Sequence, residues 1–323
     1  MGTGVVRNLK NPIIGVIDKT HAGKSMKDFI DIEREIPIIE NVNRAIKLGA
    51  EVLVIGIAPS GGRILDGWKP IIEESIKSGL SIVNGLHDLL LPEWRDIINQ
   101  QKQWIWDVRV PQFTPAIATA RASSLSNKRV LFIGTDMAVG KMTSGLELYE
   151  DLLQRRVNVG FIATGQIGIT IMGRGIPLDA FKIDHACGAV EQMVMEDADK
   201  EILIVEGQGS LLHPGSSATL PLMRGCCPTH LILCIRADKM TLRSPKNIAI
   251  PDLNKFIALN EDLATVVGTY PNAKVIGICV NTSMLSKEEA KNFINNILEK
   301  TGVETTDPVR FGVSGISNLL LEA

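Results

Sequence analysis

One loop in the second half of the chain has the residue types that cradle a phosphate. The run Gly134-Thr-Asp-Met-Ala-Val-Gly-Lys141 follows the apolar segment 130–133 and precedes a segment with helical periodicity. In such a turn, backbone N–H groups and the helix N-terminus face the anion, and a lysine adds a full positive charge. The residues that we expect at the phosphates are Gly134, Thr135, Asp136, Gly140, Lys141, Met142 and Thr143.

This loop departs from the strict phosphate-loop pattern at the position that normally serves magnesium. Met142 follows the lysine where a Ser or Thr hydroxyl is usual, and Thr143 comes one residue later, about 100° further round the helix. Without that hydroxyl, tight binding and hydrolysis of a magnesium nucleotide are disfavoured. We therefore expect a phosphate group held without a catalytic metal, and we assign no metal ligands.

Two further loops follow predicted strands of the same half. Thr164-Gly165-Gln166 comes after the apolar run 157–163, and Glu206 comes after the run 202–205. Ligands of open α/β sheets lie beyond the carboxyl ends of the strands, so both loops are candidates for the same site. Thr164, Gly165 and Gln166 are assigned to cofactor binding.

The catalytic candidates are Glu206, Gln208 and His213. Glu206 stands where a Walker-B carboxylate would lie, and Gln208 is a neutral donor suited to a carbonyl oxygen. His213 is the side chain in these loops best suited to proton transfer near neutral pH. A histidine whose ring serves only the structure is the alternative for this residue.

The first half carries weaker signals. Asp18-Lys-Thr-His-Ala-Gly-Lys24-Ser25 is similar to a phosphate loop, but Asp18 replaces the first glycine and would repel a phosphate. The loop from Ala58 to Arg63 follows the strongest predicted strand of this half, and Arg63 is suited to a carboxylate or phosphate. A solvated arginine explains Arg63 equally well.

The elements that must position these loops alternate between short apolar runs and helix-period segments, which is typical of parallel strands joined by crossover helices. Helices are predicted around 38–46, 142–153 and 290–298. The segment 111–127 lacks a sustained period and is predicted to link a domain at 1–110 to a domain at 128–323. The predicted strands are 13–17, 52–57, 80–83, 104–108, 130–133, 157–163, 202–205, 231–235 and 274–280.

Composition excludes several function classes. The formal net charge is −2 without a basic block, so neither nucleic acid nor a membrane surface is an expected partner. The first residues lack the apolar run that is typical of a signal peptide, so we expect none, and no apolar run of about 18 residues occurs that could span a bilayer. The 5 cysteines are odd in number and lack paired Cys-x-x-Cys spacing, so we expect them reduced and the protein cytoplasmic.

Four motifs in order resemble the D-glutamate N-acetyltransferase-like family: 134–143, 163–168, Gly188-Ala-Val-Glu191 and Glu206 to Pro214. The resemblance implies a Rossmann-like N-terminal domain followed by a P-loop NTPase-like α/β domain with a mainly parallel sheet. It also implies acetyl transfer from acetyl-CoA to an acidic amino acid, D-glutamate, and a homo-oligomer. The chain departs from the family in its short start and in His185, where phenylalanine is usual.

A more distant resemblance, to dethiobiotin synthetase, supplies the alternative function. The loop 134–141 has the same length, and Glu206-Gly-Gln-Gly is similar to that enzyme's metal-binding loop. An ATP-dependent ligase or kinase with Mg²⁺ would then act on a carboxylate or an amine. That enzyme's lysine before the Thr-Gly turn is missing here, because Phe161-Ile-Ala163 occupies the position. A nucleotide-dependent switch is disfavoured, since Thr135 and Asp136 stand where such switches carry an extra lysine.

Overall fold

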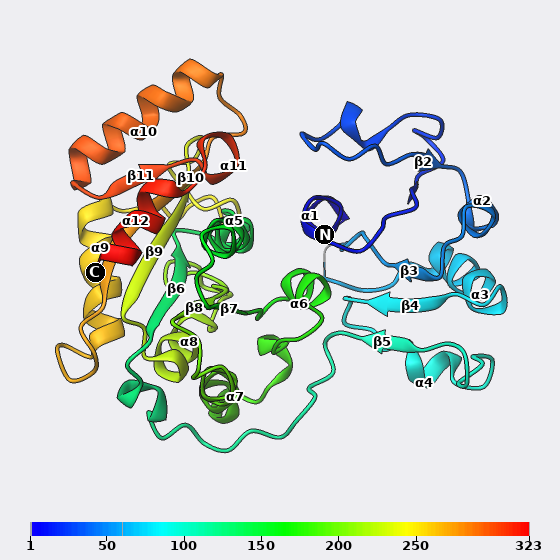
Figure 1. Cartoon of the computed structure of the whole chain (residues 1–323), viewed down its shortest axis with the longest axis horizontal. Helices are drawn as coiled ribbons and strands as arrows, with labels where there is room; N and C mark the ends of the chain where they lie inside the picture. Colours follow the sequence, from blue (N-terminus) through cyan, green and yellow to red (C-terminus); the bar gives the residue numbers. More distant parts are fainter. Residues whose placement is uncertain (1, 60, 323) are drawn as a thin grey trace. The chain divides into compact units, whose positions relative to one another are not determined.

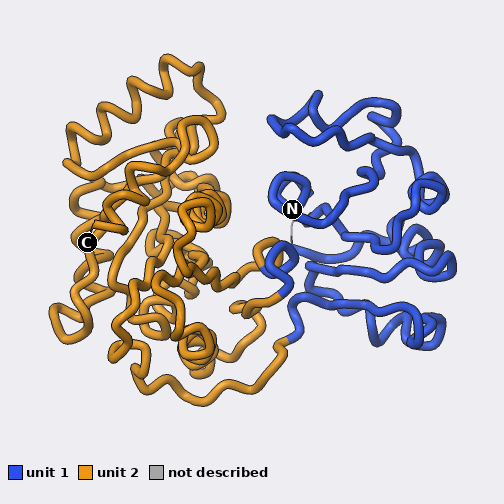
Figure 2. The backbone as a smooth tube through the Cα atoms, viewed as in Figure 1, with its two compact units in different colours: residues 1–110, 169–173 blue, residues 111–168, 174–323 orange. Residues whose placement is uncertain are grey.

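The structure is a computed structural model that describes residues 2–59 and 61–322. The chain forms two compact units (Figure 2). Unit 1 contains residues 1–110 and 169–173, and unit 2 contains 111–168 and 174–323. The first division between the units falls after Val110. The sequence did not indicate that residues 169–173 would belong to unit 1.

Unit 1 has two small parallel sheets. Strands β3, β4 and β5 form one in that order, and β1 pairs with β2 in the other. The elements are α1 (Gly2–Asn8), β1 (Val16–Ile17), η1 (Met26–Asp28), β2 (Ile38–Ile39), α2 (Val42–Lys47), β3 (Val52–Val54), η2 (Asp66–Trp68), α3 (Lys69–Lys77), β4 (Ser81–Asn84), α4 (Leu91–Trp94) and β5 (Ile105–Asp107).

The helix predicted around 38–46 begins later than its apolar spacing indicates. Ile38 and Ile39 lie in β2 and pair with β1. The side chain of Asn41 then accepts a hydrogen bond from the Arg44 N–H at 2.9 Å and so caps α2. Strand pairing and an N-cap residue outweigh the helical spacing of the two isoleucines.

Unit 2 is built on one six-stranded sheet, and every strand predicted in this half is present. The elements from residue 121 onward are η3 (Arg121–Ser124), β6 (Lys128–Gly134), α5 (Lys141–Gln154), β7 (Val159–Ile162), α6 (Gln166–Met172), η4 (Leu178–Ala180), α7 (Ile183–Glu196), β8 (Ile202–Val205), α8 (Thr219–Cys226), β9 (His230–Arg236), α9 (Leu253–Thr265), β10 (Lys274–Asn281), α10 (Lys287–Thr301), β11 (Glu304–Thr306), α11 (Pro308–Phe311) and α12 (Ser314–Glu322). Residues 169–172 of α6 belong to unit 1, and the other elements belong to unit 2.

The sheet order is β11-β10-β9-β6-β8-β7, and all neighbouring strands are parallel. Figure 1 shows the strands of this sheet with helices packed along both faces. The predicted α/β class with a mainly parallel sheet is thereby confirmed. Because the strands are parallel, the turns after β6, β8, β9 and β10 all reach one edge of the sheet. That edge holds the candidate site.

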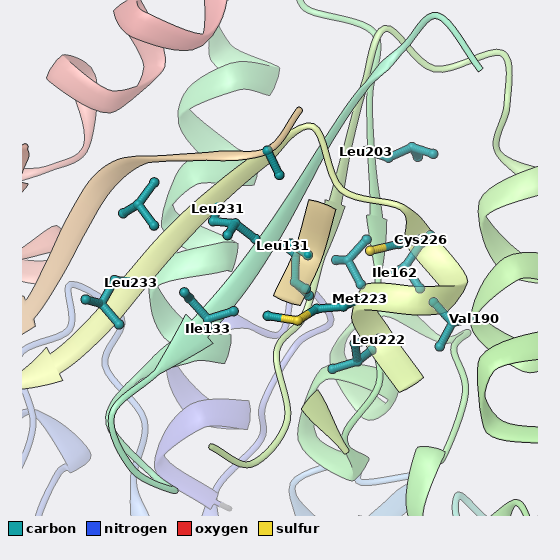
Figure 3. Close-up of a cluster of buried hydrophobic side chains, with 14 of the residues drawn as sticks. Leu131, Ile133, Ile162, Val190, Leu203, Leu222, Met223, Cys226, Leu231 and Leu233 are labelled. Carbon is teal, nitrogen blue, oxygen red and sulfur yellow. The ribbon is translucent and has the colours of Figure 1, made fainter. Parts of the chain in front are cut away.

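The core of unit 2 lies between one sheet face and helices α7, α8, α9 and α10, and Figure 3 shows part of it. Alternate residues of β6, such as Leu131 and Ile133, meet Val190 of α7 and Met223 of α8 in this cluster. The other face carries α5, where Gly145 allows the helix to approach Phe161 and Phe132. This packing fixes the start of α5 over the end of β6. None of the helices in the described part of the chain is long and apolar enough to cross a membrane.

Candidate phosphate and acyl-transfer site

The loop between β6 and α5 has the backbone form of an anion cradle. Gly140 has φ of 109° and Ala138 has φ of 54°, both in the left-handed region. Alternation of left- and right-handed residues turns successive N–H groups toward one point, which favours a bound anion. The positive φ explains the need for glycine at position 140, while Ala138 adopts this conformation at an energetic cost.

Lys141 folds back over the loop that precedes it. Its side chain is buried at 6% exposure, and Nζ donates to the Asp136 carbonyl oxygen at 2.9 Å. A Cβ at Gly134 would lie 3.1 Å from this Nζ and 2.8 Å from Val139 Cγ2, so only glycine fits there. Burial lowers the pKa of Lys141. An anion that enters the loop would compensate the buried ammonium group, which has donors to spare.

Asp136 connects the loop to a distant segment. One carboxylate oxygen accepts from the Met137 N–H and the other from the Arg243 N–H, each at 2.7 Å. Its neighbour Thr135 is fully buried, and its N–H donates to the Cys234 carbonyl oxygen at 3.1 Å. Within the described residues the Thr135 hydroxyl has no hydrogen-bond partner. These hydrogen bonds connect the phosphate loop to β9 and to the segment that follows it.

The first turn of α5 contains the two residues that follow Lys141. Met142 and Thr143 are both half-buried, and Met142 offers a thioether where a hard oxygen ligand is usual. Magnesium demands oxygen ligands in near-octahedral geometry. Among the described residues, no cluster of three or more His, Cys, Asp or Glu side chains could hold a metal ion.

Glu206 lies at the end of β8, beside the phosphate loop. Its Oε2 accepts from the N–H groups of Thr164 at 2.8 Å and Gly165 at 3.1 Å. The Thr164 hydroxyl donates to the Glu206 carbonyl oxygen at 2.8 Å. Cβ atoms at Gly165 and Gly168 would lie 3.2 Å and 2.3 Å from the carboxylate oxygens, so glycine permits this contact. The sequence predicted that these loops converge, and the contacts confirm it.

The surroundings of Glu206 bring the pKa of its carboxyl group close to neutral pH. Burial raises the pKa of this carboxyl to about 7, and the two backbone N–H groups and Lys141 partly oppose the rise. The phosphate loop is in direct contact with this region, because a Cβ at Gly207 would lie 2.9 Å from Lys141 Cδ. A carboxyl group with a pKa near the working pH is well placed to accept a proton.

Gln208 is the second candidate near this carboxylate. Its Nε2 lies 3.4 Å from Glu206 Oε1, a long hydrogen bond. The absence of a Cβ at Gly165 makes room for the same amide, which such a Cβ would approach to 2.4 Å. Gln166 opens α6 and is half-buried. Glu206 Oε1 is therefore the carboxylate oxygen with the more spare capacity to accept a proton.

His213 is placed differently from the sequence hypothesis of a proton-transfer group. Its Nε2 lies 2.6 Å from the Ser244 carbonyl oxygen, and its Nδ1 accepts from the Gly215 N–H at 3.1 Å. Because a carbonyl oxygen only accepts and an N–H only donates, these partners assign the proton to Nε2. Both ring nitrogens are engaged, which supports the structural alternative for this histidine.

Sequence reasoning missed the segment that both Asp136 and His213 contact. Residues 240–250 follow β9. In this segment the Arg243 N–H donates to Asp136, and the Ser244 carbonyl oxygen accepts from His213. No motif marks this segment. The rule that ligands gather beyond the carboxyl ends of parallel strands applies to β9 as it does to β6 and β8, and it was the available signal.

The motif Gly188-Ala-Val-Glu191 has a structural function in the described residues. Glu191 is 1% exposed and accepts from the Arg121 N–H at 2.7 Å, from the Arg121 Nε at 2.9 Å and from the Thr119 N–H. A Cβ at Gly188 would lie 1.7 Å from the Ala116 carbonyl oxygen. The motif thus binds the segment that precedes β6 to helix α7.

The candidate groups of the first half have local partners. Asp18 accepts from the Thr20 N–H at 2.9 Å and contacts His21 Nδ1 at 2.8 Å. Arg63 forms an ion pair with Asp88 at 2.8 Å and is largely exposed. Neither geometry indicates a phosphate site in this unit.

Comparison with known proteins agrees with this architecture. Residues 19–111 match the Rossmann-like domain of DUF1611, and residues 116–317 match its P-loop domain, both described as domains of unknown function. A crystal structure of a DUF1611 family protein from Anabaena variabilis is 41% identical, with a TM-score of 0.95, and covers 100% of this chain and 94% of its own.

Two relatives carry the name D-glutamate N-acetyltransferase. The protein from Pseudoalteromonas sp. is 36% identical over 279 residues, which are 85% of this chain and 83% of the relative. The protein from Tritonibacter scottomollicae is 34% identical over 277 residues, which are 84% and 81% of the two chains. The chain therefore belongs to the DUF1611 family of D-glutamate N-acetyltransferase-like enzymes.

Proposed function

We propose that this enzyme transfers the acetyl group of acetyl-CoA to the amine of D-glutamate. The names of the two relatives support the reaction and both substrates. The observation that carries the assignment in this chain is the position of Glu206. A carboxyl group with a pKa of about 7 lies directly before Gly207, where an added Cβ would lie 2.9 Å from Lys141 Cδ. A proton acceptor and an anion cradle thus share one sheet edge.

The phosphate loop would hold the phosphates of the donor without hydrolysing them. Lys141 and the N–H groups of the left-handed turn supply positive potential, and CoA offers a pyrophosphate for this charge. Met142 removes the usual magnesium ligand, and acetyl transfer needs none. The same residues that disfavour an ATP-dependent ligase are therefore neutral for an acyltransferase.

The chemical step requires one proton acceptor, and Glu206 fills that role. The donor supplies an acetyl group activated as a thioester. The neutral amine forms a bond to the acetyl carbon while the carbon–sulfur bond breaks. The proton lost by nitrogen passes to Glu206 Oε1 and from there to the departing sulfur, which leaves as the thiol of CoA. Gln208 and backbone N–H groups of the loops are the donors available to the thioester oxygen.

Glu206→Gln tests this role. Only the ionised carboxylate accepts a proton, so kcat/KM of the unmodified enzyme should rise with pH through about 7. In Glu206→Gln, kcat should fall by roughly 10²–10⁴-fold and the rise should vanish, because general base catalysis contributes about that much. Release of the CoA thiol, followed with a thiol reagent between pH 5.5 and 9, measures both effects, and mass spectrometry identifies N-acetyl-D-glutamate.

Glu191→Gln is the matched control, since Glu191 is a second buried glutamate of the same unit that binds the linker. This variant should keep the rise near pH 7. If Glu206→Gln retains both the rate and the pH profile, another residue is the base. If no acetyl transfer occurs and ATP binds tightly only with Mg²⁺, the ligase alternative replaces the acyltransferase.

A further inference from the structure

A hairpin-like segment after β9 closes on itself beside the phosphate loop. The Ile250 N–H donates to the Met240 carbonyl oxygen and the Leu242 N–H to the Ile248 carbonyl oxygen, each at 2.9 Å. Thr241 forms an antiparallel bridge with Ala249. The chain thus doubles back over residues 240–250 and presents residues 243–247 as its tip. We call this segment the β9 hairpin.

Two buried side chains hold the tip of the β9 hairpin. Asp136, in the phosphate loop, accepts from the Arg243 N–H at 2.7 Å. His213, in the loop after β8, donates to the Ser244 carbonyl oxygen at 2.6 Å. These groups are 5% and 9% exposed. Hydrogen bonds to a buried carboxylate are among the stronger ones in proteins, so the backbone at Arg243 has a fixed position relative to the phosphate loop.

Asp136 binds only the backbone N–H of Arg243, so the guanidinium group of this residue is available to bind a ligand. The side chain is exposed, and it makes no hydrogen bond or ion pair with the residues that the structure describes. By contrast, the neighbouring basic residues Arg236 and Lys239 both pair with Asp238, at 3.0 Å and 2.9 Å. An arginine fixed by its backbone and unpaired at its tip is suited to an anionic ligand, because guanidinium binds phosphate through two parallel hydrogen bonds.

The same sheet edge also exposes apolar side chains. Met137, Met240 and Met284 are 42%, 82% and 73% exposed. They follow β6, β9 and β10, which are neighbours in the sheet, so their loops emerge side by side. Methionine is flexible and polarisable and makes favourable contacts with aromatic rings. A ligand with both a ring system and a phosphate matches this combination better than a small dicarboxylic amino acid does.

We propose that Arg243 binds the 3′-phosphate of the CoA donor and makes the enzyme select CoA over its 3′-dephospho form. This inference rests on the proposed function and extends it from the pyrophosphate to the adenosine end of the donor. Asp136 belongs to the phosphate loop and grips the Arg243 backbone, so it is a positioning residue that sets the spacing between the two phosphate sites. His213 supports the same tip from the other side.

The test is isothermal titration of the whole protein, in EDTA, with CoA and with 3′-dephospho-CoA. The unmodified protein should bind CoA about 10- to 150-fold more tightly, the range expected for one charge-assisted contact. Arg243→Ala should bind both compounds with the weaker affinity. Arg243→Lys should recover part of the preference, because lysine offers a charge without the paired donors. Lys246→Ala, on the same exposed tip, is the control and should keep the full preference.

Each other outcome counts against the assignment. Equal binding of the two compounds by the unmodified protein, or a preference that survives in Arg243→Ala, overturns it. A rise in KM for D-glutamate without loss of CoA affinity would place Arg243 at the amino acid's carboxylate instead. Absence of binding for both compounds would overturn the proposed function itself and this assignment with it. Thermal unfolding of Arg243→Ala should match the unmodified protein, because the contact to Asp136 uses only the backbone.

Discussion

The carboxyl ends of the two main sheets gather polar side chains in different ways. At the β3–β5 edge of unit 1, the buried Asp107 carboxylate accepts from Asn84 Nδ2 at 2.8 Å and from the N–H groups of Leu90 and Leu91, both at 2.9 Å. In unit 2, Lys141 Nζ has a single acceptor among the residues that the structure describes, at 2.9 Å. Buried polar groups therefore mark a ligand site only where hydrogen-bonding capacity remains unused.

Asp107→Ala should produce the largest effect in this comparison, and the effect should be on stability. It leaves three donors at the buried edge of unit 1 without their acceptor, and each unsatisfied group costs about 1–3 kcal/mol. We expect a loss of roughly 3 kcal/mol or more in the unfolding of unit 1. Urea unfolding followed by fluorescence and circular dichroism measures it, with separate transitions for the two units taken into account.

Asp88→Ala is the matched control for that prediction. Asp88 also accepts a backbone N–H, from Ile64 at 2.8 Å, but its side chain is 29% exposed. Water replaces the lost acceptor there, so the loss of stability should be clearly smaller. CoA affinity should stay within about twofold for both variants. A strong loss of CoA affinity in Asp107→Ala, with unit 1 folded, would show that this edge is part of the site.

Lys141→Ala tests the sheet edge of unit 2, where a buried group still has unused hydrogen-bonding capacity. Loss of a charge-assisted contact should weaken acetyl-CoA binding by about 10- to 150-fold, or 1.5–3 kcal/mol. The binding should persist in EDTA, because Met142 stands in place of the magnesium ligand. Isothermal titration with acetyl-CoA and with ATP, each with and without Mg²⁺, makes the measurement.

Met142→Thr serves as the control at the neighbouring position. It restores a hydroxyl that magnesium would use, and acetyl transfer should stay largely intact because this chemistry needs no metal. Unchanged acetyl-CoA affinity in Lys141→Ala would remove the phosphate loop from donor binding.

The sequence predicted those parts of the site that depend on strand pattern and on the turns that follow the strands. Apolar runs with turn residues after them located β6, β7 and β8, and parallel strands bring their carboxyl ends together. The contact between Glu206 and Thr164 follows from that topology alone. Helix periodicity was less informative in α5, where the apolar stripe is formed by Met142, Leu146, Tyr149 and Leu153. Of these, Leu146 is buried and the other three are half-buried, while Leu148 and Leu152 outside the stripe are buried. A short amphipathic stripe does not determine which neighbour it meets.

The roles of Asp136 and His213 could not be predicted in the same way. Their partners, Arg243 and Ser244, lie 107 and 31 residues further along the chain. Such contacts depend on the path of the β9 hairpin, which has no periodicity or motif of its own. The residue types were informative about chemistry, since both are good hydrogen-bonding groups. The sequence did not reveal that both side chains form their hydrogen bonds with backbone groups of the β9 hairpin.

His213→Gln gives the smallest expected effect and separates the two histidine hypotheses. Because both ring nitrogens are engaged, the residue should act through the β9 hairpin and leave the proton transfer untouched. Gln keeps an N–H that donates to the Ser244 carbonyl oxygen, so stability should fall by about 1 kcal/mol or less. KM for acetyl-CoA should rise a few-fold as the Arg243 tip loosens, while kcat and its rise near pH 7 stay unchanged. His185→Gln, which alters a histidine bonded to the Pro115 carbonyl oxygen at 3.0 Å, should change neither parameter. A fall of about 10²-fold or more in kcat for His213→Gln, with loss of the pH-dependent rise, would instead make His213 the base. Glu206 would then be left as the group that orders the Thr164 turn.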